Sequence, residues 1–284
     1  MKTGCRSVLF VAGILLMLVS VTSQVGADEN AVRVYGATTF AEPMKILGKL
    51  FMNEHPGVRV EVLGKTSEFG FLALLNKETD LVMAARKPTV VERRLADQKG
   101  VEWAGARVAW ERVAVISHPG VGVTELTVDQ LRKIYTGEYK NWRDLGGIDQ
   151  PIMLHSPPYP QDDVAVWFAH NVLSKAEFTS GIIWVETPDF LVQHVSVHKG
   201  AIAYLGNLQL RGILKRHPQF KVNILRIRAN RESPALSPST EITKKEAYPL
   251  TIPLFLFWDR NNSNKWIEPF ARFCKERFQE AVRK

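Results

Sequence analysis

The fold is decided by residues 32–47, which read VRVYGATTFAEPMKIL. The two valines alternate with polar neighbours as in a strand, and apolar residues from Met44 onward recur at helical spacing. A turn of small residues that ends at Thr38 and Thr39 lies between them. Because the first N–H groups of a helix have no internal partner and the helix dipole favours negative charge there, this arrangement predicts an anion site.

The same residues allow a second interpretation that needs no ligand. Thr39 and Glu42 have the spacing of a capping box, in which the two side chains satisfy the backbone N–H groups at the start of the helix. The sequence alone leaves both interpretations open.

Polar turns also follow the next two predicted strands. Residues 58–63 alternate like a strand and lead to a polar turn, while residues 81–85 are a continuous apolar run, typical of a strand buried on both faces. In an open parallel sheet, ligands bind beyond the carboxyl ends of the strands, so we expect the three turns to converge on one crevice. The candidate ligand-binding residues are Thr38, Thr39, Thr66, Ser67 and Arg86.

Residues 1–27 have the parts of a secretory signal: basic Lys2 and Arg6, an apolar run at 8–21, and small residues before Asp28. The run of about 14 residues is shorter than the roughly 20 that span a membrane, which disfavours an anchor. Cys5 precedes the run and is therefore badly placed for lipidation. We expect the mature protein to be periplasmic or otherwise exported, and soluble after removal of the signal peptide.

Composition supports a globular chain with room for two lobes, since 45% of its 284 residues are hydrophobic. The formal net charge is +8, and it becomes +6 without Lys2 and Arg6. Basic residues are scattered rather than gathered into an aromatic and arginine track, which disfavours nucleic acid and favours an anionic ligand or a membrane surface. Cys274 is the one cysteine left after residue 27, so no internal disulfide is expected.

The rest of the chain continues the alternation of strands and helices. Thr127 and Gln130 form a capping box before a helix predicted at 128–134. The other predicted elements are helices at 90–98, 162–173 and 265–282, a helix that begins at 187–189 and ends at Gly200, strands at 113–116, 151–155, 201–205 and 222–227, a long surface loop at 229–245, and an extended segment at 248–258.

The best-known signatures of catalysis are missing from the sequence. It contains no G-x-S-x-G elbow, no phosphate-binding Walker loop, no G-x-G-x-x-G and no His-Glu-x-x-His, so an enzyme is disfavoured and no cofactor is expected. His194 and His198 have the spacing of two ligands on one helix face. Because no carboxylate or cysteine nearby completes a set, the sequence assigns no metal site.

Six ordered segments give the mature chain a resemblance to the phosphate-binding-protein-like family, the periplasmic substrate-binding components of phosphate ABC importers. They are GATTF at 36–40, GKTSEFG at 64–70, TDLVMAAR at 79–86, LRKIYTG at 131–137 with its following Asn-Trp and Gly-Gly pairs, KGAIAY at 199–204, and YPLTIPL at 248–254. The first two resemble the family's anion loops, and the third resembles its strand that ends in ligand-facing residues.

One segment departs from this family. The second-lobe anion loop of this family normally holds an arginine and a Gly-Ser-Gly-Thr-like turn. In this chain the corresponding residues 155–163 read HSPPYPQDD. Asp162 and Asp163 would cap the helix that follows and repel a phosphate. Ala84 and Ala85 also replace hydroxyl or acidic partners that the family pattern contains. The sequence leaves open whether the loop has drifted or the ligand has changed, and we expect phosphate to bind weakly or not at all.

The resemblance implies an α/β, two-lobed periplasmic-binding-protein-like fold with a ligand cleft between the lobes. We expect lobe one to comprise residues 28–114 and 247–284, and lobe two residues 115–246. The expected function is binding of phosphate or a related oxyanion by closure of the lobes, for delivery to the membrane permease of an ABC importer. The alternative is a sensory or interaction module of the same fold that acts on a membrane sensor, and an exported hydrolase is disfavoured.

Overall fold

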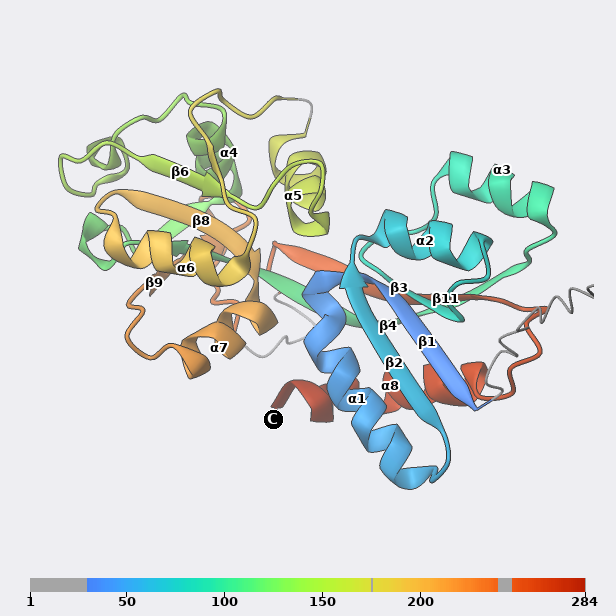
Figure 1. Cartoon of the computed structure of the whole chain (residues 1–284). Helices are drawn as coiled ribbons and strands as arrows, with labels where there is room; N and C mark the ends of the chain where they lie inside the picture. Colours follow the sequence, from blue (N-terminus) through green and yellow to red (C-terminus); the bar gives the residue numbers. More distant parts are fainter. Residues whose placement is uncertain (1–29, 175, 240–246, 284) are drawn as a thin grey trace, which may run out of the picture.

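The computed structural model describes residues 30–174, 176–239 and 247–283. The predicted signal at 1–27 and residues 240–245 of the predicted surface loop lie outside the described residues. Figure 1 shows two α/β lobes side by side, which confirms the predicted fold class. In the described part of the chain, no helix combines the length and apolar character that a membrane span requires.

Lobe one, named here for the elements before β4 together with the C-terminal β11 and α8, is built on parallel strands. β1 pairs with β2 on one side and with β3 on the other, both in parallel, and β11 pairs with β3 in antiparallel fashion. The elements are β1 (Ala31–Ala37), η1 (Thr38–Phe40), α1 (Ala41–Glu54), β2 (Arg59–Lys65), α2 (Ser67–Leu75), β3 (Leu81–Ala84), α3 (Val90–Lys99), β11 (Thr251–Asp259) and α8 (Ile267–Arg283).

The long strand β4 (Trp103–Ser117) runs through both lobes, so the two half-sheets are continuous. Its first part pairs with β11 up to Arg112, and from Val113 it pairs with β8 (Ala201–Gly206) instead. The predicted strand at 113–116 is the end of this longer element. Because the partner changes between Arg112 and Val113, we propose the lobe boundary close to the expected residue 114.

Lobe two, named here for the elements from η2 to β10, has β6 at the centre of its parallel part. This strand pairs in parallel with β8 and β7. The remaining elements are η2 (Pro119–Val121), β5 (Glu125–Thr127), α4 (Val128–Tyr135), η3 (Trp142–Leu145), β6 (Met153–Ser156), α5 (Asp163–Phe168), a π-helical turn η4 (Ala169–Leu173), β7 (Ile183–Trp184), α6 (Pro188–Val197), α7 (Asn207–Arg216), β9 (Asn223–Ile224) and β10 (Arg226–Arg228).

Most of the predicted elements are present, and the differences have physical causes. The capping box of Thr127 and Gln130 is confirmed at the start of α4. The single strand predicted at 222–227 is wrong, because Leu225 turns inward between β9 and β10 and is fully buried. Helix α7 was not predicted because Gly206, the residue before it, provides no capping side chain.

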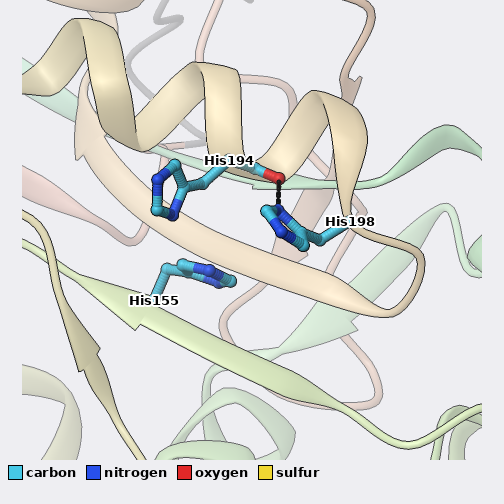
Figure 2. Close-up of side chains that lie close together, drawn as sticks. All are labelled: His155, His194 and His198. Carbon is cyan, nitrogen blue, oxygen red and sulfur yellow. Dashed lines mark hydrogen bonds between the residues drawn. The ribbon is translucent and has the colours of Figure 1, made fainter.

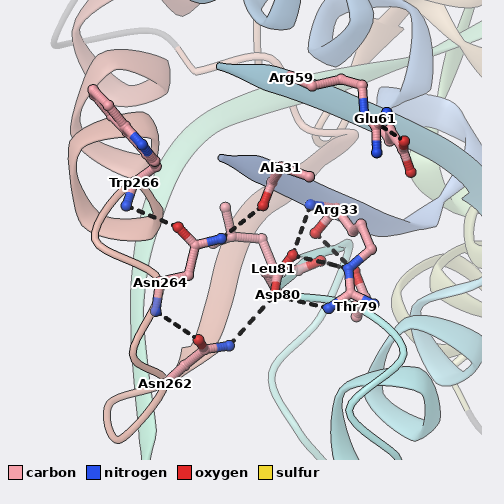
Figure 3. A network of polar contacts seen from close by, with 10 residues as sticks. All are labelled: Ala31, Arg33, Arg59, Glu61, Thr79, Asp80, Leu81, Asn262, Asn264 and Trp266. Atoms are coloured by element: carbon pink, nitrogen blue, oxygen red, sulfur yellow. Dashed lines mark hydrogen bonds and ion pairs between the residues drawn. The ribbon is translucent and has the colours of Figure 1, made fainter. Parts of the chain in front are cut away.

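A polar network fixes the amino ends of the lobe-one strands (Figure 3). The Asp80 carboxylate accepts from the backbone N–H of Arg33 at 2.9 Å and from its guanidinium at 3.1 Å. Asn262 also donates to Asp80, at 3.4 Å, and Asn264 donates to the carbonyl of Ala31 at 2.7 Å. The returning C-terminal segment is thereby joined to the start of β1, at the opposite end of the strands from the predicted crevice.

Candidate functional site

The carboxyl ends of β1, β2 and β3 meet at one edge of the sheet. Ala37 lies opposite Lys65, and Gly36 lies opposite Met83, so the turns that follow the three strands emerge together. Gly36 has φ 143°, and a Cβ atom there would lie 2.0 Å from the carbonyl oxygen of Met83. Only glycine permits β1 and β3 to approach so closely at this edge.

Ser67 lies at the centre of the edge, at the first position of α2. It is fully buried, and its hydroxyl accepts a hydrogen bond from the backbone N–H of Ala85 at 2.9 Å. Its own N–H is one of the donors that a helix start leaves without an internal partner. That N–H donates to the carboxylate of Asp163 at 2.8 Å. The helix start in lobe one therefore binds a negatively charged oxygen that belongs to lobe two.

Asp162 and Asp163, at the end of the segment 155–163 that differs from the family pattern, have different roles. Asp162 caps α5, because its carboxylate accepts from the N–H groups of Val164 and Ala165 at 2.8 and 3.0 Å. Asp163 reaches across to Ser67, so the prediction that both would cap α5 is correct for Asp162 only. Burial raises the pKa of Asp162 to about 6 and also raises the pKa of Asp163.

Arg86 is held beside the same edge by a carboxylate of its own lobe. Two of its nitrogens donate to Glu92 at 2.7 and 2.8 Å, and its guanidinium lies 5.1 Å from the ring centre of Phe71. Glu92 is buried, and it also accepts from the N–H of Thr89 in the capping box of α3. Burial opposes its charge, while the bonds from Arg86 and Thr89 lower its pKa overall. Glu92 was not among the predicted site residues, although the capping-box spacing of Thr89 and Glu92 is visible in the sequence.

The threonines of the candidate site make three different contacts. Thr38 is exposed and donates to the carbonyl of Lys65 at 2.8 Å, while Thr66 caps α2 by accepting from Phe69 at 3.0 Å. Thr39 is buried, and its hydroxyl has no hydrogen-bond partner among the described residues. The alternative capping box of Thr39 with Glu42 is absent, because Thr39 lies in η1 and Phe40 precedes α1.

The Thr39 hydroxyl lies against lobe two, at the start of α7. A Cβ atom at Gly206 would lie 2.4 Å from it, so glycine is needed for the two lobes to approach here. Glu111, in the part of β4 that pairs with β11 of lobe one, accepts from the N–H of Leu208 at 2.9 Å and so caps α7 of lobe two. Burial raises the pKa of Glu111 to about 8.

A groove of about 710 Å³ continues from this contact between the lobes. Its lining residues come from α1 and β2 of lobe one, from α6 and α7 of lobe two, and from the end of α8. Lys45 pairs with Glu42 at 2.8 Å and Arg216 with Asp189 at 3.0 Å, so these charges are compensated within each lobe. Residues near the predicted crevice, including Thr38 and Gly64, line one end of the groove.

Comparison with known proteins supports the same architecture. The PBP superfamily domain matches residues 22–276. The phosphate-binding protein PstS of Staphylococcus saprophyticus is 23% identical over 267 residues, which cover 88% of this chain and 77% of that protein.

Two solved structures have the same fold. A candidate phosphate ABC transporter substrate-binding protein from Clostridium perfringens, solved with bound phosphate, has a TM-score of 0.70 at 22% identity and covers 86% of this chain and 92% of its own. An ABC-type phosphate transport receptor from Vibrio cholerae has a TM-score of 0.65 at 19% identity, and the match covers 88% of this chain and 96% of that receptor.

Proposed function

Because the chain belongs to the PBP superfamily domain family, we propose that it is an exported substrate-binding protein that holds a small oxyanion such as phosphate at the start of α2. The ligand is bound and released unchanged, without catalysis. The expected partner is the membrane permease of an ABC importer, since similar proteins carry names that refer to phosphate binding and ABC transport.

One observation carries this proposal: the N–H of Ser67 donates to a carboxylate at 2.8 Å. Carboxylate and phosphate oxygens are both anionic acceptors, and both are favoured by the N–H groups and dipole of a helix start. A donor that binds one such oxygen is suited to the other. We assign Thr38, Thr39, Thr66 and Arg86, which follow the strands β1, β2 and β3, to the same proposed site.

Asp163 competes with the ligand for this position. A phosphate can reach the Ser67 N–H only after Asp163 has moved away, and lobe two then presents a negative charge toward the anion. Since closure depends on the difference in ligand affinity between the open and closed states, this competition reduces the drive to close around phosphate. We therefore expect weak binding.

The second candidate function is a sensory or interaction module with altered or lost anion binding. Its support is that both charged groups at the site are already paired, Asp163 with Ser67 and Arg86 with Glu92. Such a module would be closed without a ligand and would present its surface to a membrane sensor.

The test uses two substitutions at Ser67 in the mature chain. Ser67→Pro removes the donating N–H at a position where a helix tolerates proline, and Thr66 before it has the extended backbone that proline requires. Ser67→Ala is the matched control, because it loses the same hydroxyl and retains the N–H. We expect phosphate, sulfate or molybdate at about 10 mM to raise the melting temperature of the wild type and of Ser67→Ala, but not of Ser67→Pro.

Two results would contradict the proposal. Equal shifts for the proline and alanine variants would remove the α2 start from the site. The absence of any shift in the wild type, together with recovery of a membrane sensor as a bound partner, would favour the second candidate.

A further inference from the structure

Three histidines lie together in lobe two, apart from the proposed anion site (Figure 2). His155 is on β6, His194 is on α6, and His198 follows the end of that helix. One ring nitrogen of each lies within 4.8 Å of the others. The ring centres of His194 and His198 lie 5.5 and 6.1 Å from that of His155. The fold thus adds a third imidazole to the pair visible in the sequence.

Backbone contacts fix which nitrogen two of these rings can offer. The Nδ1 of His198 lies 2.9 Å from the carbonyl oxygen of His194, and the Nδ1 of His155 lies 3.2 Å from that of Met153. Because a carbonyl only accepts, each Nδ1 carries the proton and each Nε2 keeps its lone pair free. Metal-binding histidines are oriented in this way, with the second ring nitrogen donating to a backbone carbonyl or a carboxylate.

His155 is the unusual member of the cluster. Its side chain is fully buried, and its Nε2 has no hydrogen-bond partner in the described part of the chain. Buried polar atoms nearly always have a partner, and each exception calls for an explanation. A core histidine satisfied by its surroundings would have both nitrogens paired, so this explanation does not fit. A group bound between His155, His194 and His198 would satisfy this buried, unpaired lone pair.

We propose that His155, His194 and His198 bind a divalent transition-metal ion of the zinc class. Three imidazoles suit Zn²⁺, Co²⁺, Ni²⁺ or Cu²⁺, whereas Mg²⁺ and Ca²⁺ take oxygen ligands. Tetrahedral zinc with bonds of about 2.0–2.1 Å needs nitrogens roughly 3.3 Å apart, so small side-chain rotations would close the present separation. His194 is half-buried and His198 is exposed, which gives the ion a path from solvent and leaves a fourth position for water.

Such an ion would join α6 to β6. The strand β6 leads directly into residues 157–161 and the aspartate pair, so the ion would stabilise the part of lobe two that faces the cleft. The proposal does not depend on the anion site, since its three ligands belong to lobe two alone. The proposal replaces the prediction of no metal site. That prediction was made because only His194 and His198 stand out as a pair in the sequence.

The test is a Zn²⁺ titration of the mature chain, without a polyhistidine tag and after removal of metals with a chelator. We expect one ion per chain by calorimetry, and Co²⁺ should give the intense visible absorption of a tetrahedral site. His194→Gln and His198→Gln should each weaken Zn²⁺ binding by at least about tenfold. His170→Gln is the matched control, because His170 is exposed in the same lobe and lies outside the cluster.

The surface variants keep the test valid even if a change at buried His155 prevents folding. Their folding is checked by melting curves without metal. An affinity for Zn²⁺ that stays the same in the His194→Gln, His198→Gln double variant would overturn the proposal, as would absence of Zn²⁺ binding at micromolar concentration. Asp163→Asn should leave Zn²⁺ affinity unchanged, which separates this site from the proposed anion site.

Discussion

Replacing Asp163 by Asn should raise the affinity for phosphate by about 5- to 30-fold. The carboxylate accepts from the Ser67 N–H at 2.8 Å, and a phosphate must displace it. A hydrogen bond to a charged group contributes about 1.5–3 kcal/mol, against about 0.5–1.5 kcal/mol for a neutral one. The hydrogen bond from the Ser67 N–H to the asparagine should therefore be weaker by about 1 to 2 kcal/mol than the one to the aspartate. Because each 1.4 kcal/mol is tenfold in affinity, phosphate should gain by the factor given above.

Isothermal titration with phosphate at low ionic strength and about pH 8 measures this gain, since salt screens the interaction. Asp162→Asn is the matched control. It removes a carboxylate from the neighbouring residue, and asparagine caps a helix as well as aspartate does, so α5 should be retained. We expect a gain of less than about threefold for this control, because only the Asp163 carboxylate occupies the Ser67 donor.

A second readout uses pH. Burial raises the pKa of Asp163, so this carboxylate takes up a proton at a higher pH than an exposed aspartate does. Sulfate keeps its charge between about pH 5 and pH 8, so its affinity for the wild type should rise as the pH falls. This rise should be smaller in Asp163→Asn, where Asp162 with its pKa of about 6 remains. Equal gains for the two asparagine variants, or tight phosphate binding by the wild type with no gain from Asp163→Asn, would refute the competition.

Three further predictions concern other parts of the chain. Arg86→Lys should weaken anion binding by about 1–3 kcal/mol in a titration, because lysine cannot form the two-point contact of a guanidinium; unchanged affinity would remove Arg86 from the site. Glu111→Gln should flatten the dependence of stability on pH. The folded pKa of about 8 lies above the unfolded value, so the wild type loses about 2–3 kcal/mol as the pH rises from about 6 to 9, and urea denaturation of both proteins measures the difference. Mass spectrometry of exported protein should find a chain that begins near Asp28, and a retained N-terminus in the membrane fraction would indicate an anchor.

The sequence was sufficient for several structures that depend on residues close together along the chain. Alternation and helical spacing predicted β1 and α1, and the spacing of Thr127 and Gln130 predicted the start of α4. The parallel order of β1, β2 and β3 followed from three repeats of strand, turn and helix, so the meeting of their carboxyl ends was predictable. In each case the prediction rests on the spacing of residues that are close in the sequence, or on a strand, turn and helix pattern that repeats along the chain.

Local reasoning failed where a distant segment supplies the partner. Thr39 and Glu42 have capping-box spacing, but Thr39 is buried in η1 against Gly206 of lobe two, and no cap forms. Helix α7 has no local cap, because the residue before it is Gly206. Its first turn is capped instead by Glu111, 97 residues before Leu208. Both contacts join residues that are far apart in the sequence, so a pattern of a few neighbouring residues cannot predict them.

The chemistry of the site was decided by tertiary structure for the same reason. The sequence predicted an anion site at the Ser67 turn, whereas the fold brings Asp163, 96 residues away, to its N–H. Likewise, the sequence contains the His194 and His198 pair, and only the packing of α6 on β6 adds His155. Spacing along the chain determines which groups a helix or turn presents, while the partner of a buried donor or lone pair is determined by whatever the packing of the lobes brings within about 3 Å.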